Sequence, residues 1–99
     1  MTYQVRYTEA ARLDVIRRYR FLLQKDVNAA RQAFNAIPEA VKILELFPFT
    51  CRKADQDDPF LRELMISFGS SGYIALFKVD EDNIVTIAAI RHQCEDDYH

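Results

Sequence analysis

The chain has 99 residues, a formal net charge of −2 and a hydrophobic share of 49%. This length fits one domain with one core, so we expect a single domain over residues 1–99, and the apolar share excludes a disordered chain. With only two glycines and three prolines, the chain is neither collagenous nor loop-rich.

The cysteines and the N-terminus indicate where the protein works. No apolar run reaches the roughly 20 residues that a membrane span needs. Residues 1–6 contain neither an apolar signal core nor a small-residue cleavage site, so we expect a cytoplasmic protein without membrane contact. Cys51 and Cys94 make no disulfide framework and are expected as free thiols. A zinc site formed by them with His92 and His99 lacks the close paired spacing of zinc motifs, so we expect no metal and no cofactor.

The charge is spread unevenly along the chain. Residues 1–53 carry ten Lys/Arg and five Asp/Glu, whereas residues 54–99 carry three Lys/Arg and ten Asp/Glu. A basic half can meet an acidic partner or nucleic acid. Equally, the two halves can pair with each other in the fold, because charge patterning alone does not distinguish the two cases.

The first elements are a strand and a helix. Residues 3–7 alternate apolar and polar side chains, which predicts a strand. Thr8 is typical of a helix N-cap, with Glu9 in the first turn, and residues 9–24 contain no Gly or Pro. The expected apolar stripe of this helix consists of Leu13, Ile16, Arg20 and Leu23, flanked by Tyr19 and Leu22. Its basic flank consists of Arg12, Arg17, Arg18 and Arg20.

A second helix follows almost at once. Asp26 is expected to cap it, Pro38 to kink it and Pro48 to end it. Because the link between the two helices is so short, they should form an antiparallel hairpin. The apolar residues that repeat at helical spacing are Ala30, Ala33, Phe34, Ile37, Val41, Leu44 and Phe47.

The rest of the chain is predicted to be sheet. Residues 48–59 are polar and unpatterned, which indicates a surface loop. Short turns at 67–72 and 80–83 make the following strands an antiparallel meander, and 91–99 form a polar tail. The strands are expected over residues 60–66, 73–79 and 84–90, the middle one central and covered on both faces.

These elements together define a fold class. The sheet must bury its apolar face, and the two helices are the only elements that can cover it. We therefore predict an α+β domain of two layers: an N-terminal strand, an antiparallel helix hairpin and a three-stranded antiparallel meander packed on the helices.

This order of elements resembles that of the ParE/RelE toxins, and the similarity covers the whole chain. Its sharpest block is Leu61-Arg62-Glu63-Leu64, followed by Phe68-Gly69, Gly72-Tyr73 and Leu76-Phe77. The second block is the ending, Ile90-Arg91-His92-Gln93 with Glu95-Asp96-Asp97-Tyr98, and the opening helix with Ala10, Arg12, Leu13 and Ile16 is similar as well.

The resemblance implies the toxin of a type II toxin–antitoxin pair, of the kind linked to growth arrest and plasmid stabilisation. A cognate antitoxin encoded beside it would neutralise it and would alone contact operator DNA. ParE-type members inhibit DNA gyrase, whereas RelE-type members cut messenger RNA on the ribosome. A third possibility is an inactive or purely regulatory relative that only binds its antitoxin.

We predict the ParE-type gyrase inhibitor, which needs no catalytic group, and keep the ribosome-dependent endoribonuclease as the alternative. The sequence pI is about 5.6, whereas a protein that enters ribosomal RNA should be basic. Under the alternative, Arg62 and Arg91 would bind phosphate, and His92 and Tyr98 would act as acid and base. Arg62 could equally make a surface ion pair, and Arg91 could simply hold the acidic tail.

Two binding surfaces are expected. The target would meet the basic flank of the first helix and the C-terminal segment, although a merely solvated flank is the plainer interpretation. An antitoxin helix or strand would dock on apolar residues and on a sheet edge at residues 60–64. The target residues are Arg12, Arg17, Arg18 and Arg91, and the antitoxin residues are Tyr19, Leu22, Leu23, Phe60 and Leu64.

Overall fold

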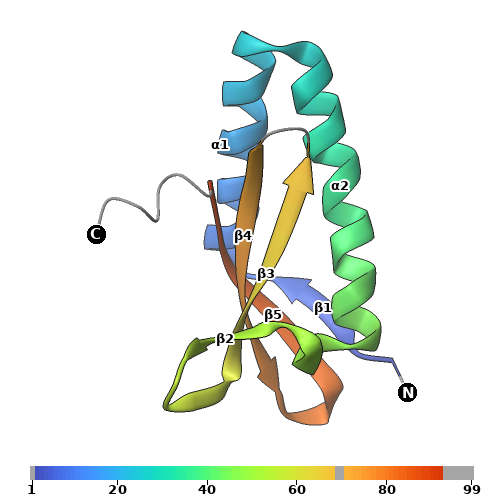
Figure 1. Cartoon of the computed structure of the whole chain (residues 1–99), viewed down its shortest axis with the longest axis vertical. Coiled ribbons are helices and arrows are strands. Elements are labelled where there is room, and N and C mark those ends of the chain that lie inside the picture. Colours follow the sequence, from blue (N-terminus) through green and yellow to red (C-terminus); the bar gives the residue numbers. More distant parts are fainter. Residues whose placement is uncertain (1, 69–70, 93–99) are drawn as a thin grey trace.

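The computed structural model describes residues 2–68 and 71–92, which form one five-stranded sheet with a helix hairpin on one face (Figure 1). The predicted α+β class and order of elements are confirmed. The helices and strands are β1 (Gln4–Tyr7), α1 (Glu9–Lys25), α2 (Val27–Leu46), η1 (Pro48–Thr50), β2 (Arg52–Asp55), β3 (Asp58–Phe68), β4 (Ser71–Asp80), η2 (Glu81–Asn83) and β5 (Ile84–His92).

Short polar side chains set the ends of the two helices. Thr8 caps α1, because its Oγ1 accepts a hydrogen bond from the Ala11 amide at 3.1 Å. Asp26 ends α1 and caps α2, and its carboxylate accepts from the Asn28 amide at 2.9 Å. The predicted hairpin is confirmed, and α2 runs through Pro38 without a break in its assignment.

The sheet order is β1-β5-β4-β3-β2. The pairs β3–β4 and β4–β5 are antiparallel, as the meander prediction requires, whereas β1 lies parallel to β5 at the opposite edge from β2. The turn between β4 and β5 places Asp82 and Asn83 at positive φ, a conformation that Asp and Asn tolerate better than most residues.

The predicted loop over residues 48–59 is wrong, because it contains η1, β2 and the start of β3. Strand β2 pairs antiparallel with β3 through Arg52 opposite Glu63 and Lys53 opposite Arg62. All four residues of β2 are exposed, so the strand carries no alternation of apolar and polar side chains. The meander therefore has one more strand than the sequence indicates.

The predicted apolar stripe of α1 is also wrong. Leu13 is 54% exposed and Ile16 is 43% exposed, whereas Ala11 on the other side of the helix is fully buried. Val15 and Leu22 pack with Ala11 against the core that the helices share with the sheet. The small Ala11 lets α1 approach the sheet closely, which turns the bulkier residues outward.

The helices cover only one face of the central strand β4. Its residues at odd positions, from Tyr73 to Val79, belong to the core under the helices. On the other face Ile74 is buried but Lys78 is exposed, so the expected burial of both faces is wrong for the second half of the strand. We call this second face the open face. Within the described residues, no helix is both long and apolar enough to cross a membrane.

Candidate functional site

Arg62 clamps η1 to the sheet. Its guanidinium donates from Nε to the Pro59 carbonyl at 2.8 Å, and from Nη1 to the carbonyls of Phe49 at 3.0 Å and Cys51 at 2.7 Å. The same group lies 5.0 Å from the centre of the Phe49 ring. Hydrogen bonds from a charged donor are stronger than neutral ones. Arg62 therefore works on the backbone of its own chain, and Glu63 pairs with Arg52 instead.

Arg91 lies on the other face of the sheet. Arg62 stands opposite Phe77, whose side chain is in the core under the helices, whereas Arg91 stands opposite Ile74 on the open face. Side chains alternate between faces along a strand, so the two arginines project on opposite sides. The structure does not bring them together into one phosphate site.

A β-bulge in β5 produces this separation. The register between β4 and β5 shifts by one residue: Phe77 pairs with Ile87, but the next residue of β4, Leu76, pairs with Ala89. Ala88 therefore has no partner residue in β4. Ile87 and Ile90 are both buried although they are three residues apart, whereas in a regular strand they would face opposite sides of the sheet. If the alternation ran on from Ile87 through Ala88 without a bulge, Arg91 would share the face of Ile87 and hence of Arg62.

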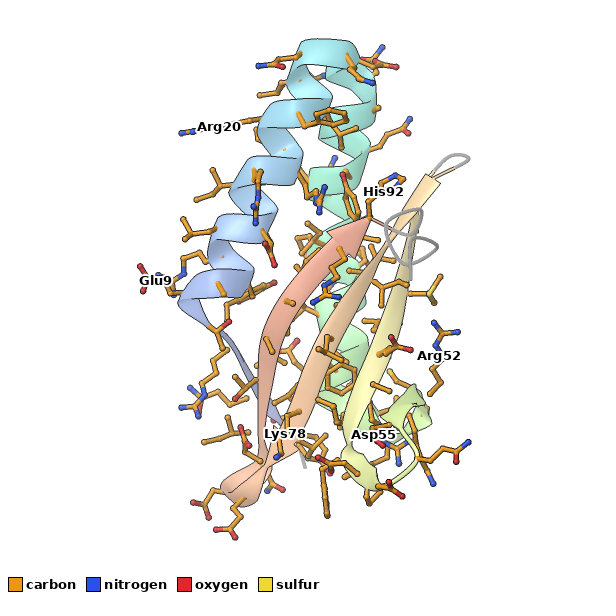
Figure 2. The ribbon with its side chains drawn as sticks, turned by 90° about the vertical axis from the view of Figure 1, so that its left-hand side faces the viewer. Glu9, Arg20, Arg52, Asp55, Lys78 and His92 are labelled. Carbon is orange, nitrogen blue, oxygen red and sulfur yellow. The ribbon has the colours of Figure 1, made fainter. Side chains whose placement is uncertain are left out.

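Of the two candidate acid–base residues, the structure describes only His92. His92 stands opposite Tyr73, with ring centres 5.6 Å apart, at the end of β5 (Figure 2). Tyr98 lies outside the described residues. Among the described residues, Arg62 and Arg91 thus project from opposite faces of the sheet, and Arg62, Arg91 and His92 form no common cluster.

The cations of the open face are mostly paired with carboxylates. Arg6 lies 3.8 Å from Asp80 and Arg52 lies 2.8 Å from Glu63. Lys78 lies 3.8 Å from Asp58. A phosphate group arriving here would have to compete with these carboxylates. Arg91 is the exception: its side chain is exposed and makes no hydrogen bond or ion pair with the described residues.

Metal ligands are not gathered anywhere in residues 2–68 and 71–92, which contain no group of His, Cys, Asp and Glu suited to a metal. Cys94 and His99 lie outside these ranges. Cys51 is buried, and this burial raises the pKa of its thiol, while the nearby Arg62 opposes the shift. The thiol is therefore held in its neutral form.

The three arginines of the expected target surface do not share one face of α1. Arg12 is exposed, and Arg17 is exposed and pairs with Asp14. Arg18 points inward, where it lines a small cavity with Tyr73 and Ile90. Only Arg12 and Arg17 remain available to a partner on the outside of the helix.

The residues expected to bind the antitoxin fall into two separate groups. Tyr19, Leu22 and Leu23 lie on the second half of α1, near the helix turn, whereas Phe60 and Leu64 belong to β3. The α1–α2 turn and the β2–β3 hairpin lie at opposite ends of the long axis (Figure 1). The expected sheet edge at residues 60–64 is also wrong, because β2 pairs with β3 as far as Glu63.

Within these groups the side chains differ in accessibility. The Tyr19 ring contacts that of Phe34, with 5.3 Å between centres, and Leu22 packs on the core. Leu23 is exposed, and so is Phe60, which contacts the Phe49 ring at 6.1 Å. Leu64 is only 9% exposed, so it supports the fold rather than a surface.

The outward side of α1 carries the exposed apolar residues Leu13, Ile16 and Leu23, which the sequence predicted to belong to the buried stripe. Figure 2 shows Glu9 and Arg20 projecting from this side of α1, away from the sheet, whereas Arg52 projects on the opposite side. The signal that could have revealed the row is the series of smaller residues at Ala11 and Val15, which marks the face that packs closely.

The sheet order and the helix hairpin on one face are the architecture expected of a toxin of the ParE/RelE class. Residues 5–97 match the family described as the ParE toxin of the type II toxin–antitoxin system parDE. The chain belongs to this family.

One relative and two solved structures are similar to the chain. The chain is 35% identical over 85 residues to "Toxin RelE3" of Caulobacter vibrioides, and the match covers 86% of this chain and 88% of that protein. The chromosomal ParDE toxin–antitoxin system from P. aeruginosa aligns with a TM-score of 0.67 at 21% identity, covering 91% of this chain and 95% of that one. A mutant of the E. coli toxin RelE in the free state aligns with a TM-score of 0.56 at 16% identity, covering 99% and 92%. At these identities the two structures support the fold alone.

Proposed function

We propose that this toxin arrests growth by binding DNA gyrase in the cytoplasm and inhibiting it, and that it does not cut RNA. The observation that carries the proposal is the placement of the two arginines expected to hold a phosphate. Arg62 is engaged by three backbone carbonyls, and Arg91 projects from the opposite face of the sheet. A nuclease would need such groups gathered around one phosphate.

The charge distribution supports the same proposal. The chain is acidic overall, and the cations of the open face other than Arg91 are paired with carboxylates among the described residues. Binding to nucleic acid depends mainly on unpaired Lys and Arg facing the phosphates. Gyrase would instead meet an exposed protein surface that includes Arg12, Arg17 and Arg91.

The partner that neutralises the toxin is a cognate antitoxin, as family membership implies. We place part of its footprint near the helix turn, where Leu23 is exposed and the Tyr19 and Phe34 rings lie against each other. We leave Phe60 and Leu64 out of this part of the footprint, because both belong to β3 and Leu64 is only 9% exposed. Contact with operator DNA would be made by the antitoxin.

A ribosome-dependent endoribonuclease is the second candidate. It is favoured by the 35% identity to a protein named Toxin RelE3. In this case Arg91 would be the phosphate ligand, since it is exposed on the open face. A purely regulatory relative is the third candidate and predicts no growth arrest when the toxin is expressed alone.

Purified gyrase separates these candidates. Antitoxin-free toxin is added to gyrase with ATP and relaxed plasmid, and supercoiling and double-strand breaks are followed on gels. The gyrase proposal predicts loss of supercoiling or accumulation of breaks, both reversed by antitoxin. If gyrase is unaffected while ribosome-bound messenger RNA is cut in a parallel reaction, the nuclease is correct and the gyrase proposal is wrong.

A further inference from the structure

Strand β3 is longer than the strand that covers its outer edge. One side of β3 pairs with β4 as far as Phe68, whereas on the other side β2 reaches only Glu63. From Leu64 to Phe68 no strand of the described chain pairs with this outer side. We call residues 64–68 the free edge. The backbone N–H and C=O groups along an unpaired edge form a template on which another strand can add.

The free edge lacks the features that usually block such pairing. Its sequence, LMISF, contains no charged residue and no proline, and its pairing with β4 keeps a regular register, without a bulge that would bend it away. By contrast, the short edge strand β2 carries Arg52, Lys53 and Asp55 in four residues. The chain thus protects one part of this side of the sheet with charges and leaves the other part open to a strand.

An open apolar groove runs beside the free edge, with a volume of about 620 Å³. Met65 and Ile66 both line it, although neighbouring side chains of a strand point to opposite faces, so the edge between them is open to the groove. From α2, Ile43 and Leu46 contribute apolar side chains that are 43% and 51% exposed. Figure 1 shows the second half of β3 next to α2, with no strand between them. The groove therefore offers an added strand both a backbone partner and apolar contacts.

The charge beside the groove is balanced. The two charged residues that line it, Glu39 and Lys42, pair with each other, with 3.6 Å between the carboxylate oxygen and the ammonium nitrogen. A surface with one charge of each sign favours neither a basic nor an acidic segment, and it can meet an identical surface without net repulsion. The matching occupant is an uncharged apolar strand, and the free edge of a second copy is such a strand.

We infer that two copies of the antitoxin-free toxin pair antiparallel through their free edges. A two-fold axis perpendicular to the sheet would join the two sheets into one, because each free edge supplies the hydrogen-bonding groups that the other lacks. The end of each β3 would enter the groove of the other copy beside Ile43. The inference goes beyond the proposed function and does not depend on gyrase.

This arrangement has consequences for the other surfaces. Both helix layers would lie on one side of the joined sheet and both open faces on the other side. The dimer would therefore present two copies of Arg91 in the same direction, and the outside of α1 would stay uncovered in each copy. A contact of one short strand and one groove is small, and small interfaces are weak, so we expect a dimer dissociation constant on the order of 10 µM.

Sedimentation equilibrium of the purified antitoxin-free toxin, from about 1 to about 200 µM, tests the inference. The wild type should pass from monomer to dimer within this range. M65K brings like charges together across the paired edges, and I43E places a charge in the groove. Each should raise the dissociation constant at least about tenfold. The matched controls are L13K and L13E, the same changes at an exposed residue on the outside of α1, and both should dimerise as the wild type does.

Hydrogen exchange locates the contact independently. The amides of residues 64–68 should exchange more slowly in the wild type as its concentration rises, and M65K should remove this dependence. Thermal unfolding shows whether each variant is folded, so that loss of the dimer is not confused with loss of the fold.

Three results would overturn the inference. The wild type could stay monomeric at the highest concentration. The L13 variants could dissociate a dimer that M65K and I43E leave intact, which would place the contact on α1. A monomeric wild type whose binding to purified antitoxin or gyrase is weakened by M65K would assign the free edge to that partner. A gyrase assay that fails while the dimer behaves as expected removes the gyrase proposal and leaves this inference standing.

Discussion

Arg62 shows how one side chain can hold an irregular segment in place. The residues after α2 turn through η1 before they enter β2, and this turn has few backbone partners within the sheet. Arg62 supplies donors to the carbonyls of Phe49 and Cys51 and stacks on the Phe49 ring. The sequence places an arginine at this position, but an arginine that binds phosphate and one that binds carbonyls have the same appearance in a sequence.

Replacing Arg62 by alanine should lower the free energy of unfolding by about 2 kcal/mol, because several charge-assisted hydrogen bonds are lost at once. Urea unfolding followed by circular dichroism measures the change. R52A is the control, since it removes only the exposed pair with Glu63 and should cost less than about 1 kcal/mol. Unchanged stability of R62A together with lost toxicity would show a direct functional role instead.

The buried Cys51 thiol should react slowly in the folded protein. Burial raises its pKa, so the reactive thiolate is scarcer than in the unfolded chain. In the C94S variant, iodoacetamide at pH 8 should label native Cys51 at least about tenfold more slowly than urea-unfolded protein. The pKa of Cys51 is higher in the folded than in the unfolded chain, so its thiol contributes to the free energy of unfolding. This contribution is complete below an unfolded pKa of about 8.5 and is lost as pH rises through the folded pKa. Equal labelling rates would contradict this account.

At the scale of elements, the β-bulge at Ala88 decides which face of the sheet carries the end of β5. The pairing of β1 ends at Ile87, and beyond it the outer edge of β5 is met by α1 instead of a strand. Thr8 donates from its hydroxyl to the Ala88 carbonyl at 3.1 Å, and Asp14 accepts from the Ile90 amide. These two contacts hold the bulge against the helix and so direct Arg91 to the open face.

Removing the Asp14 carboxylate should loosen the contact between α1 and the end of β5. In D14A the Ile90 amide loses its acceptor, which should cost about 1–3 kcal/mol in unfolding free energy. Hydrogen exchange at the Ile90 amide, followed by NMR, should become faster than in the wild type. D14N keeps an acceptor oxygen and should restore most of the protection. If exchange is equally slow in D14A, the helix does not secure this edge.

The sequence predicts where helices and strands lie better than it predicts which of their faces are buried. The strand alternation at Tyr3, Val5 and Tyr7 and the cap at Thr8 are local signals, and both are confirmed. Strand β2 has no such signal, because it is exposed along its whole length and exists through its pairing with β3. The predicted faces of α1 are reversed because Leu13 and Ile16 are more hydrophobic than Ala11, whereas close packing against the sheet selects the smaller residue.

At the scale of the whole molecule, the sequence supplies candidate site residues but not their arrangement in space. Neither Ala88 nor Ala89 is a residue type that predicts the bulge, and this bulge puts Arg91 on the opposite face from Arg62. The inward turn of Arg18 likewise follows from the tertiary packing of α1 and not from its charge pattern. What remains is a toxin with two exposed surfaces on opposite sides, the outside of α1 with Leu13 and Ile16 and the end of β5 with Arg91.

Arg91 offers the clearest test of how the whole molecule acts. Its side chain is exposed and has no hydrogen bond or ion pair with the described residues, so R91E should change the unfolding free energy by less than about 0.5 kcal/mol. If Arg91 contacts gyrase, the variant should inhibit supercoiling several-fold less than the wild type while antitoxin affinity stays the same. The control is K53E, an equal charge change on the exposed strand β2.

The two chemistries predict different losses for the same variant. A nuclease that uses Arg91 to bind phosphate would lose cleavage of ribosome-bound messenger RNA in R91E, whereas a gyrase inhibitor would show no such cleavage in either form. Because Arg62 is occupied by backbone carbonyls, R62A would confound a loss of activity with a loss of stability. Arg91 avoids this difficulty, and growth arrest by R91E at wild-type strength would exclude it from both target surfaces.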